Sequence, residues 1–159
     1  MGSRSNINLA YIAGFLDGDG SLMLQLKKRN DRSKGFRFMA TICFYQDTRH
    51  EQSLHWIKKI FGIGYISRRN DGMTELRING FNQTNNILRK LLPFIKFKRK
   101  QANILYKAIR ILINVRGKQL KRKQLVQLVN YIIAIQNENY VTKRKKSKEE
   151  FLSMLGLTP

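Results

Sequence analysis

Apolar residues recur with two different periods along this chain. Near the N-terminus they fall at positions i, i+3, i+4 and i+7, a spacing that is typical of one buried helix face. We therefore predict a helix from about Leu9 to Asp17. Asn8 can cap this helix, and Gly18 and Gly20 end it. The apolar face of the helix consists of Leu9, Ile12, Ala13 and Leu16.

Strict two-residue alternation follows and predicts β-strands. From Ser21 to Arg29 and from Phe36 to Tyr45, one set of alternate positions is apolar and the other is mostly polar. Two shorter strands are predicted from Tyr65 to Arg69 and from Thr74 to Asn79. Because only one face of such a sheet is apolar, we expect one covered side and one open side.

Helical periods return between the strand pairs and after them. Thr48 and Glu51 form a capping-box pattern that predicts a helix to about Phe61. Ser147 and Glu150 form a second capping box before a short helix that ends near Leu155. The remaining predicted helices span Asn85 to Leu92, Lys100 to Asn114 and Lys121 to Gln136.

The resulting order is αββαββ followed by further helices, which places the chain in the α/β class, in its mixed α+β form. We find no repeat and no linker that would divide it. One domain over residues 7–155 is expected, with residues 1–6 either disordered or vector-derived.

Charge narrows the choice of partner. The 159 residues carry 31 Lys and Arg against 10 Asp and Glu, for a net charge of +21, and no acidic residue lies between Leu76 and Asn137. A polyanion, and nucleic acid first of all, is the expected partner.

The single cysteine, Cys43, lies at an outward strand position. It leaves no partner for a disulfide and indicates a reducing compartment. No apolar run is long enough to span a membrane.

The outward strand positions are polar and mostly basic. An antiparallel ribbon of this kind can enter the major groove of DNA, where Arg, Lys and Gln donate to purine edges. The alternative is an ordinary solvated sheet face. The basic run that starts at Lys143 and Arg144 is expected to contact phosphates. The expected DNA contacts on the sheet are Gln25, Lys27, Arg29, Arg37, Ser67, Arg69, Glu75 and Arg77.

The first helix carries two further signals. Ala10, Gly14 and Gly18 recur every four residues on one stripe, which would let a second backbone approach closely. Asp19 follows at the C-terminal end of the helix, where the helix dipole disfavours an anion and a cation would remove the conflict. Taken alone, Asp17 and Asp19 are better read as two turn-forming residues without a metal.

The segment from Ala13 to Gly20, AGFLDGDG, resembles the motif of the LAGLIDADG homing endonucleases. Gly62 to Ile66 and Pro93 to Asn103 are similar to segments of the single-motif, homodimeric members, and the order of helices and strands agrees. The resemblance covers about residues 7–155. It implies the family fold, with an antiparallel DNA-binding saddle and additional C-terminal helices.

The resemblance also implies an active site. Asp19 would be the acidic metal ligand with the Gly18 carbonyl beside it, Gln46 would order water, and Lys98 would polarise the water network. The nearby arginine of the family falls on His50, so His50 or Arg49 would have to replace it. Asp17 lies two residues before the ligand position Asp19, and its replacement is expected to have a milder effect.

By this resemblance the chain is a site-specific double-strand DNA endonuclease that leaves short 3′ overhangs. Mg²⁺ is the expected cofactor, with Mn²⁺ able to substitute and Ca²⁺ able to support binding without cleavage. Because the motif occurs once, two chains packed along Ala10, Gly14 and Gly18 would have to supply the carboxylates, and a two-fold axis implies a long pseudo-palindromic target. The alternative is a non-catalytic binder such as an intron-splicing maturase. The abundance of Ile, Asn and Lys suggests an organelle genome, of a chloroplast or mitochondrion.

Overall fold

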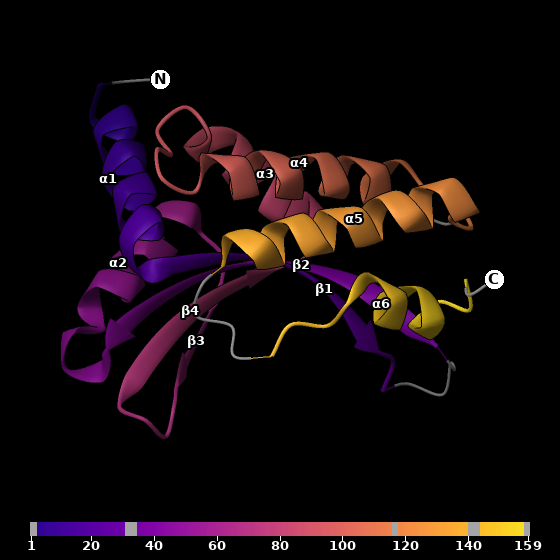
Figure 1. The fold of residues 1–159 in the computed structure, drawn as a ribbon. Helices are drawn as coiled ribbons and strands as arrows, with labels where there is room; N and C mark the ends of the chain where they lie inside the picture. Colours follow the sequence, from indigo (N-terminus) through magenta and orange to yellow (C-terminus); the bar gives the residue numbers. More distant parts are fainter. Residues whose placement is uncertain (1–2, 31–34, 116–117, 140–143, 158–159) are drawn as a thin grey trace.

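The computed structural model describes residues 3–30, 35–115, 118–139 and 144–157, with six α-helices, one 3₁₀ turn and four strands in this part of the chain (Figure 1). The αββαββ order with additional C-terminal helices is confirmed. The elements are α1 (Ser3–Asp19), β1 (Gly20–Lys28), β2 (Phe36–Asp47), a 3₁₀ turn (Thr48–His50), α2 (Gln52–Phe61), β3 (Tyr65–Arg68), β4 (Met73–Asn79), α3 (Phe81–Leu91), α4 (Arg99–Asn114), α5 (Arg122–Glu138) and α6 (Lys148–Met154).

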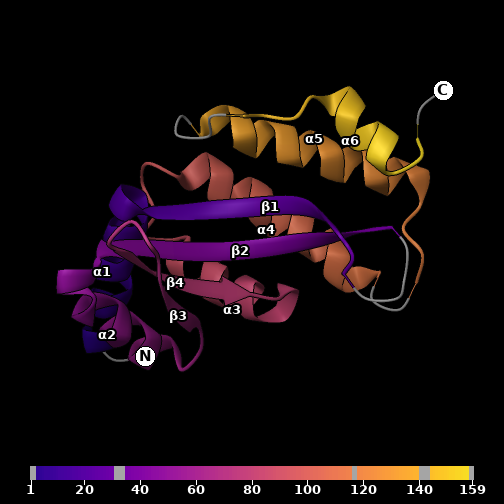
Figure 2. The same ribbon diagram turned by 90° about the horizontal axis from the view of Figure 1, so that it is seen from below.

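The four strands form one antiparallel sheet in the order β1-β2-β4-β3. Helices α3 and α4 lie along one face of this sheet, α5 packs along the edge strand β1, and the opposite face is open when the molecule is seen from below (Figures 1 and 2). The predicted covered and open sides are therefore both present. Among the described helices, none is long and apolar enough to cross a membrane.

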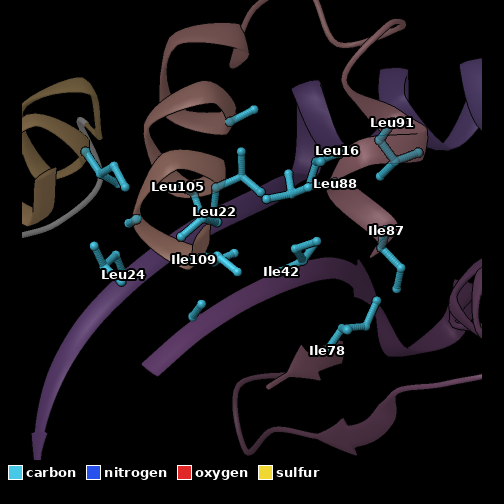
Figure 3. Packing of buried hydrophobic residues seen from close by; sticks show 14 of the residues in the cluster. Leu16, Leu22, Leu24, Ile42, Ile78, Ile87, Leu88, Leu91, Leu105 and Ile109 are labelled. Carbon is cyan, nitrogen blue, oxygen red and sulfur yellow. The ribbon is translucent and has the colours of Figure 1, made fainter. Parts of the chain in front are cut away.

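The core lies between the sheet and the helices. Inward residues of the strands meet the apolar faces of α1, α3 and α4, and their side chains are almost completely buried (Figure 3). Burial of this kind is the main favourable contribution to folding. The labelled residues of this cluster include Leu16, Leu22, Ile42, Leu88, Leu105 and Ile109.

Several helix starts differ from the sequence prediction. α1 begins at Ser3, so Asn8 lies inside the helix and does not cap it, and residues 3–6 are helical. α3 begins at Phe81 because Gly80, with φ of +94°, turns the chain out of β4 directly into the helix. A side chain at residue 80 would be strained in that conformation.

The predicted capping box at Thr48 and Glu51 is absent. Residues 48–50 form a 3₁₀ turn, and Asp47 accepts the Arg49 backbone N–H at 2.9 Å in place of Thr48. The Glu51 side chain instead bonds Arg68 of β3 and the Thr74 hydroxyl of β4. The carboxylate thus joins α2 to the sheet, because a nearby arginine gives it a stronger partner than a backbone amide does.

Candidate functional site

The end of α1, the start of β1 and the turn before α4 surround one cavity. Its lining includes Asp17, Gly18, Asp19 and Lys98, which the sequence singled out. Residues from β2, from the β3–β4 turn and from the end of α5 complete the wall. The LAGLIDADG-like segment and Lys98, about eighty residues apart in sequence, therefore lie in the same place.

Asp17 has a role that its position in the sequence did not reveal. The residue is buried, and its Oδ2 accepts the backbone N–H groups of Lys96 and Phe97 at 2.7 and 3.1 Å. Its Oδ1 accepts the N–H of Lys98 at 2.9 Å. These amides lie just before the start of α4, where an anion is favourable and where free N–H groups need acceptors. These hydrogen bonds to Asp17 hold the turn that contains Lys98 against the end of α1.

The side chain of Lys98 bonds the end of α1 in turn. Its Nζ donates to the Asp17 carbonyl at 2.5 Å, and the Gly18 carbonyl lies 3.5 Å away. Burial lowers the pKa of Lys98, while the negative charges of Asp17 and Asp19 act in the opposite direction. The ammonium group of Lys98 thus supplies part of the positive charge that the C-terminal end of the α1 dipole favours.

Asp19, in contrast, is exposed at the mouth of the cavity. Within the described residues, no group of three His, Cys, Asp or Glu side chains could hold a metal ion. Mg²⁺, however, is commonly bound through one or two carboxylates together with water and substrate phosphates. The hard oxygen donors of Asp19 and the Gly18 carbonyl fit a partial site of this kind.

Tyr45 of β2 lines the same cavity, although the sequence did not single it out. Its hydroxyl lies 3.0 Å from Ser21 Oγ of β1, and burial is the main cause of its raised pKa. The signal was present in the alternation of β2, which places Tyr45 on the open face at the end of the strand nearest the first helix. Arg69 and Asp71 also line the cavity and form an ion pair at 2.7 Å.

The other expected catalytic residues lie outside this lining. Gln46 has its Oε1 bonded to the Asp47 backbone N–H at 2.9 Å. Arg49 forms two side-chain bonds to Asp47, which hold the pKa of that carboxyl well below its usual range. His50 is exposed at the end of the 3₁₀ turn. Their participation therefore remains a prediction for the protein bound to its partners.

The open face of the sheet carries most of the predicted DNA contacts, although not all as free cations. Lys27 and Arg37 are exposed and directly opposite each other in the register of β1 and β2. Arg77 donates to the buried Glu75 carboxylate, with Nε 2.6 Å from Oε1, beside Ser67 on β3. Arg77 is therefore fixed in orientation by its neighbour on the same strand.

The two ends of the face carry the other predicted contacts. Arg29 is exposed just beyond β1. Arg144 lines a cavity together with Gln25 and Lys27, which brings the basic C-terminal tract beside β1. Lys143 lies outside the described residues. The outward position predicted for Cys43 is correct in register, but neighbouring side chains bury it completely, and this burial raises the pKa of its thiol to about 11.

Comparison with known proteins identifies the family. A model of the LAGLIDADG endonuclease family matches residues 12–98, which is more than half of the chain. The chain belongs to the LAGLIDADG endonuclease family. The DNA endonuclease I-CvuI of Chlorella vulgaris is 34% identical over 71% of this chain and 70% of its own. The DNA endonuclease I-CreI of Chlamydomonas reinhardtii is 30% identical over 89% of this chain and 84% of its own.

Solved structures agree with this assignment. I-CvuI in complex with its target in the presence of Ca superposes with a TM-score of 0.85 at 28% identity, over 99% of this chain and 100% of that one. The DNA-bound homing endonuclease I-SmaMI, at 20% identity, shares the fold with a TM-score of 0.73 over 94% of this chain, but over only 48% of its own. The LAGLIDADG fold of this chain thus corresponds to about half of the larger protein.

In this member of the LAGLIDADG family, the predicted stripe of α1 is uncovered. Ala10, Gly14 and Gly18 are exposed, and a Cβ atom added at Gly14 or Gly18 would meet no atom within 4 Å. Ile7 and Tyr11 next to them are 63% and 70% exposed. Nothing within the described chain therefore requires glycine at these two positions, although glycine inside a helix costs about 1 kcal/mol relative to alanine.

Proposed function

We propose that this protein is a site-specific, Mg²⁺-dependent endonuclease that cuts both strands of DNA. The observation that supports this most directly is the cavity at the end of α1. There an exposed carboxylate, Asp19, lies beside the partly buried Lys98 and next to the open face of a basic sheet. A protein that only bound nucleic acid would gain nothing from an unpaired carboxylate facing phosphates.

We propose further that the working form is a homodimer. Among the described residues, Asp19 is the only exposed carboxylate of this cavity that forms no ion pair, whereas cleavage of two strands needs a set of ligands at each scissile phosphate. Packing of two α1 helices along Ala10, Gly14 and Gly18 would bring two copies of Asp19 together. The fit of this fold to half of a larger endonuclease supports the same arrangement. The target would then be long and pseudo-palindromic, and the products would carry short 3′ overhangs.

Each residue of the site has a role in this proposal. Asp19 and the Gly18 carbonyl would hold Mg²⁺, which when bound supplies charge stabilisation to the phosphate and the leaving 3′ oxygen. Lys98, held by the carbonyl groups at the end of α1, orients water toward the phosphate. Gln46 would order further water molecules, and His50 or Arg49 would supply the remaining polar group. Mn²⁺ is expected to replace Mg²⁺, and Ca²⁺ to support binding alone.

Cleavage of a randomised plasmid library tests the activity. Wild-type protein with Mg²⁺ should linearise a subset of plasmids, and Asp19→Asn should abolish cleavage while leaving DNA binding in metal-free buffer unchanged or tighter. The matched control is Asp71→Asn, a second carboxylate in the same cavity, which should still cut. Cleavage by Asp19→Asn at a rate near wild type would refute the catalytic assignment.

A wild-type protein that binds its site but never cuts with Mg²⁺ or Mn²⁺ would instead favour the maturase-like binder.

From composition alone, we place the protein in a chloroplast or mitochondrion.

A further inference from the structure

Positive charge is almost unopposed along one long stretch of this chain. Residues 76–137 contain fourteen Lys and Arg and no acidic residue. Four of the five ion pairs among the described residues involve arginines of the strands or of the turns after β2 and β3, and the fifth joins α4 to α5. These pairs are Arg49–Asp47, Arg68–Glu51, Arg69–Asp71, Arg77–Glu75 and Lys100–Glu138.

Unpaired cations of this tract lie on the exposed sides of three neighbouring helices. α3 packs against α4 and α4 packs against α5, while their apolar sides face the sheet (Figure 1). The exposed sides of α3 and α4 therefore point away from the open face of the sheet, and α5 continues this surface at the edge strand β1 (Figure 2). We call this surface the outer helical face, defined by the cations Arg89, Lys90, Lys107, Arg110, Arg122 and Lys123.

None of these six side chains forms an ion pair with a carboxylate in the part of the chain that the structure describes. Their neighbours on the exposed helix sides, such as Asn86, Asn103 and Asn130, are uncharged. Six like charges on one surface repel one another and maintain a positive potential. A polyanion that covers the outer helical face would relieve this repulsion.

The side chains of this face favour a duplex over other polyanions. The large exposed apolar residues of the described chain lie on α1, α2, β3 and the turn before α4, and not on α3, α4 or α5. Single-stranded nucleic acid is usually held by exposed aromatic rings, and a membrane surface by apolar anchors. A duplex needs only cations that meet its phosphates. The 16-residue α4 is about 24 Å long, which matches the rise of about seven base pairs.

We infer that the outer helical face binds a second DNA duplex, without sequence preference, on the side of the protein opposite the proposed target site. One protein would then hold two DNA segments at once. This inference goes beyond the proposed endonuclease activity and does not require it, because it concerns binding only.

A bridging assay in EDTA tests the inference without cleavage. A 40-base-pair duplex is fixed to beads, protein is added, and capture of a second, fluorescent duplex is measured at about 50 mM salt. Wild-type protein should capture the second duplex and lose it near 200 mM salt. The outer-face variant, Arg89→Gln with Lys90→Gln, Lys107→Gln and Arg110→Gln, should still bind the beads but capture at least tenfold less.

The matched control removes the same number of cations from the sheet. Lys27→Gln with Arg29→Gln, Arg37→Gln and Arg69→Gln should lose the duplex on the open face of the sheet but should still bind duplex DNA through the outer helical face, which each protomer of the proposed dimer carries. The milder pair Lys107→Gln and Arg110→Gln should give an intermediate loss, and thermal unfolding would verify that each variant folds.

Three results would overturn the inference. The first is a wild-type protein that does not bridge at 50 mM salt. The second is an outer-face variant that bridges within twofold of wild type. The third is at least tenfold better capture of single-stranded RNA or of anionic vesicles than of duplex DNA, which would assign this face to another partner. Cleavage of the plasmid library is a separate readout, so failure of either proposal leaves the other measurable.

Discussion

At the scale of single residues, the carboxylate of Asp17 joins two segments that carry the site. It accepts three backbone N–H groups of the turn before α4, and Lys98 of that turn bonds the end of α1 in return. Asp19, two residues later, has its carboxylate exposed at the cavity. The two acidic residues of the motif thus divide between holding the site together and facing its contents.

Asp17→Asn should therefore affect stability as well as activity. The amide offers one acceptor oxygen where the carboxylate offers two, so at least one buried N–H is left with a poorer partner. We expect a loss of about 1–3 kcal/mol in the free energy of unfolding, together with slower cleavage because Lys98 is displaced. Denaturant titration and single-turnover cleavage measure the two effects. Ca²⁺ should still strengthen DNA binding in Asp17→Asn, unlike in Asp19→Asn.

A gain of stability on Asp17→Asn, or a loss of the Ca²⁺ response, would contradict this division of roles. The sequence alone predicted only a milder effect for Asp17→Asn than for Asp19→Asn. It could not reveal that Asp17 holds the turn before α4, because the partners of Asp17 lie 79 to 81 residues away.

Arg77 is expected to read bases. Its Nε and one terminal nitrogen donate to Glu75, which leaves the other terminal edge of the guanidinium for DNA. Arg77→Ala should relax discrimination at one or two base pairs in each half-site, at a cost of roughly 1–3 kcal/mol there. Cleavage of a library of single-base variants of the target would measure this. An equal loss over all sequences would make Arg77 a phosphate contact instead.

At the scale of elements, Glu51 connects α2 to the strands β3 and β4. Hydrogen bonds from Arg68 and then from Thr74 lower the pKa of this carboxyl from 4.5 to about 2. A depressed pKa in the folded state means that the contribution to stability is present above pH 4.5 and is lost as the pH falls toward 2.

Glu51→Gln should therefore lower the Tm at pH 7, and the difference from wild type should shrink between pH 4.5 and pH 2. Thermal unfolding followed by circular dichroism over this range measures the trend. Asp71→Asn, which removes a carboxylate from an exposed ion pair, is the control and should change the Tm little. A Tm difference for Glu51→Gln that stays constant down to pH 2 would show that the ion pair is not its cause.

The same elements indicate what the sequence could predict. The strands and their covered faces were predicted well because an alternation of period two reflects burial directly, as Leu22 and Ile42 illustrate. The start of α2 was predicted wrongly. The capping pattern at Thr48 and Glu51 is local, whereas the Glu51 side chain bonds Arg68 of β3 and Thr74 of β4. Likewise, the family resemblance located Asp19 and Lys98, whereas the alternation of β2 gave only the face on which Tyr45 lies, and its place in the cavity followed from the pairing of β1 with β2.

At the scale of the whole molecule, the uncovered stripe of α1 makes assembly testable. Gly14→Leu would fill the space that a second α1 helix needs, while within the chain it would meet no neighbouring atom at its Cβ. We expect a folded monomer that no longer cuts both strands. Analytical ultracentrifugation, with and without DNA, measures the assembly state.

Asn130→Leu on the exposed side of α5 is the control for an added apolar side chain, and it should remain dimeric. A Gly14→Leu protein that still forms dimers and cuts normally would rule out the α1 stripe as the interface.

The exposed Asp19 at the end of this stripe has a consequence for how activity depends on the amount of protein made. In the proposed dimer the two carboxylates come from two separate translation products, so well below the dissociation constant the amount of working enzyme rises with the square of the amount of chain made. Halving synthesis then reduces activity to about a quarter. A host that carries such a gene would thus be shielded from stray breaks at low expression, and a tandem fusion of two copies would remove this shield without changing any residue of the site.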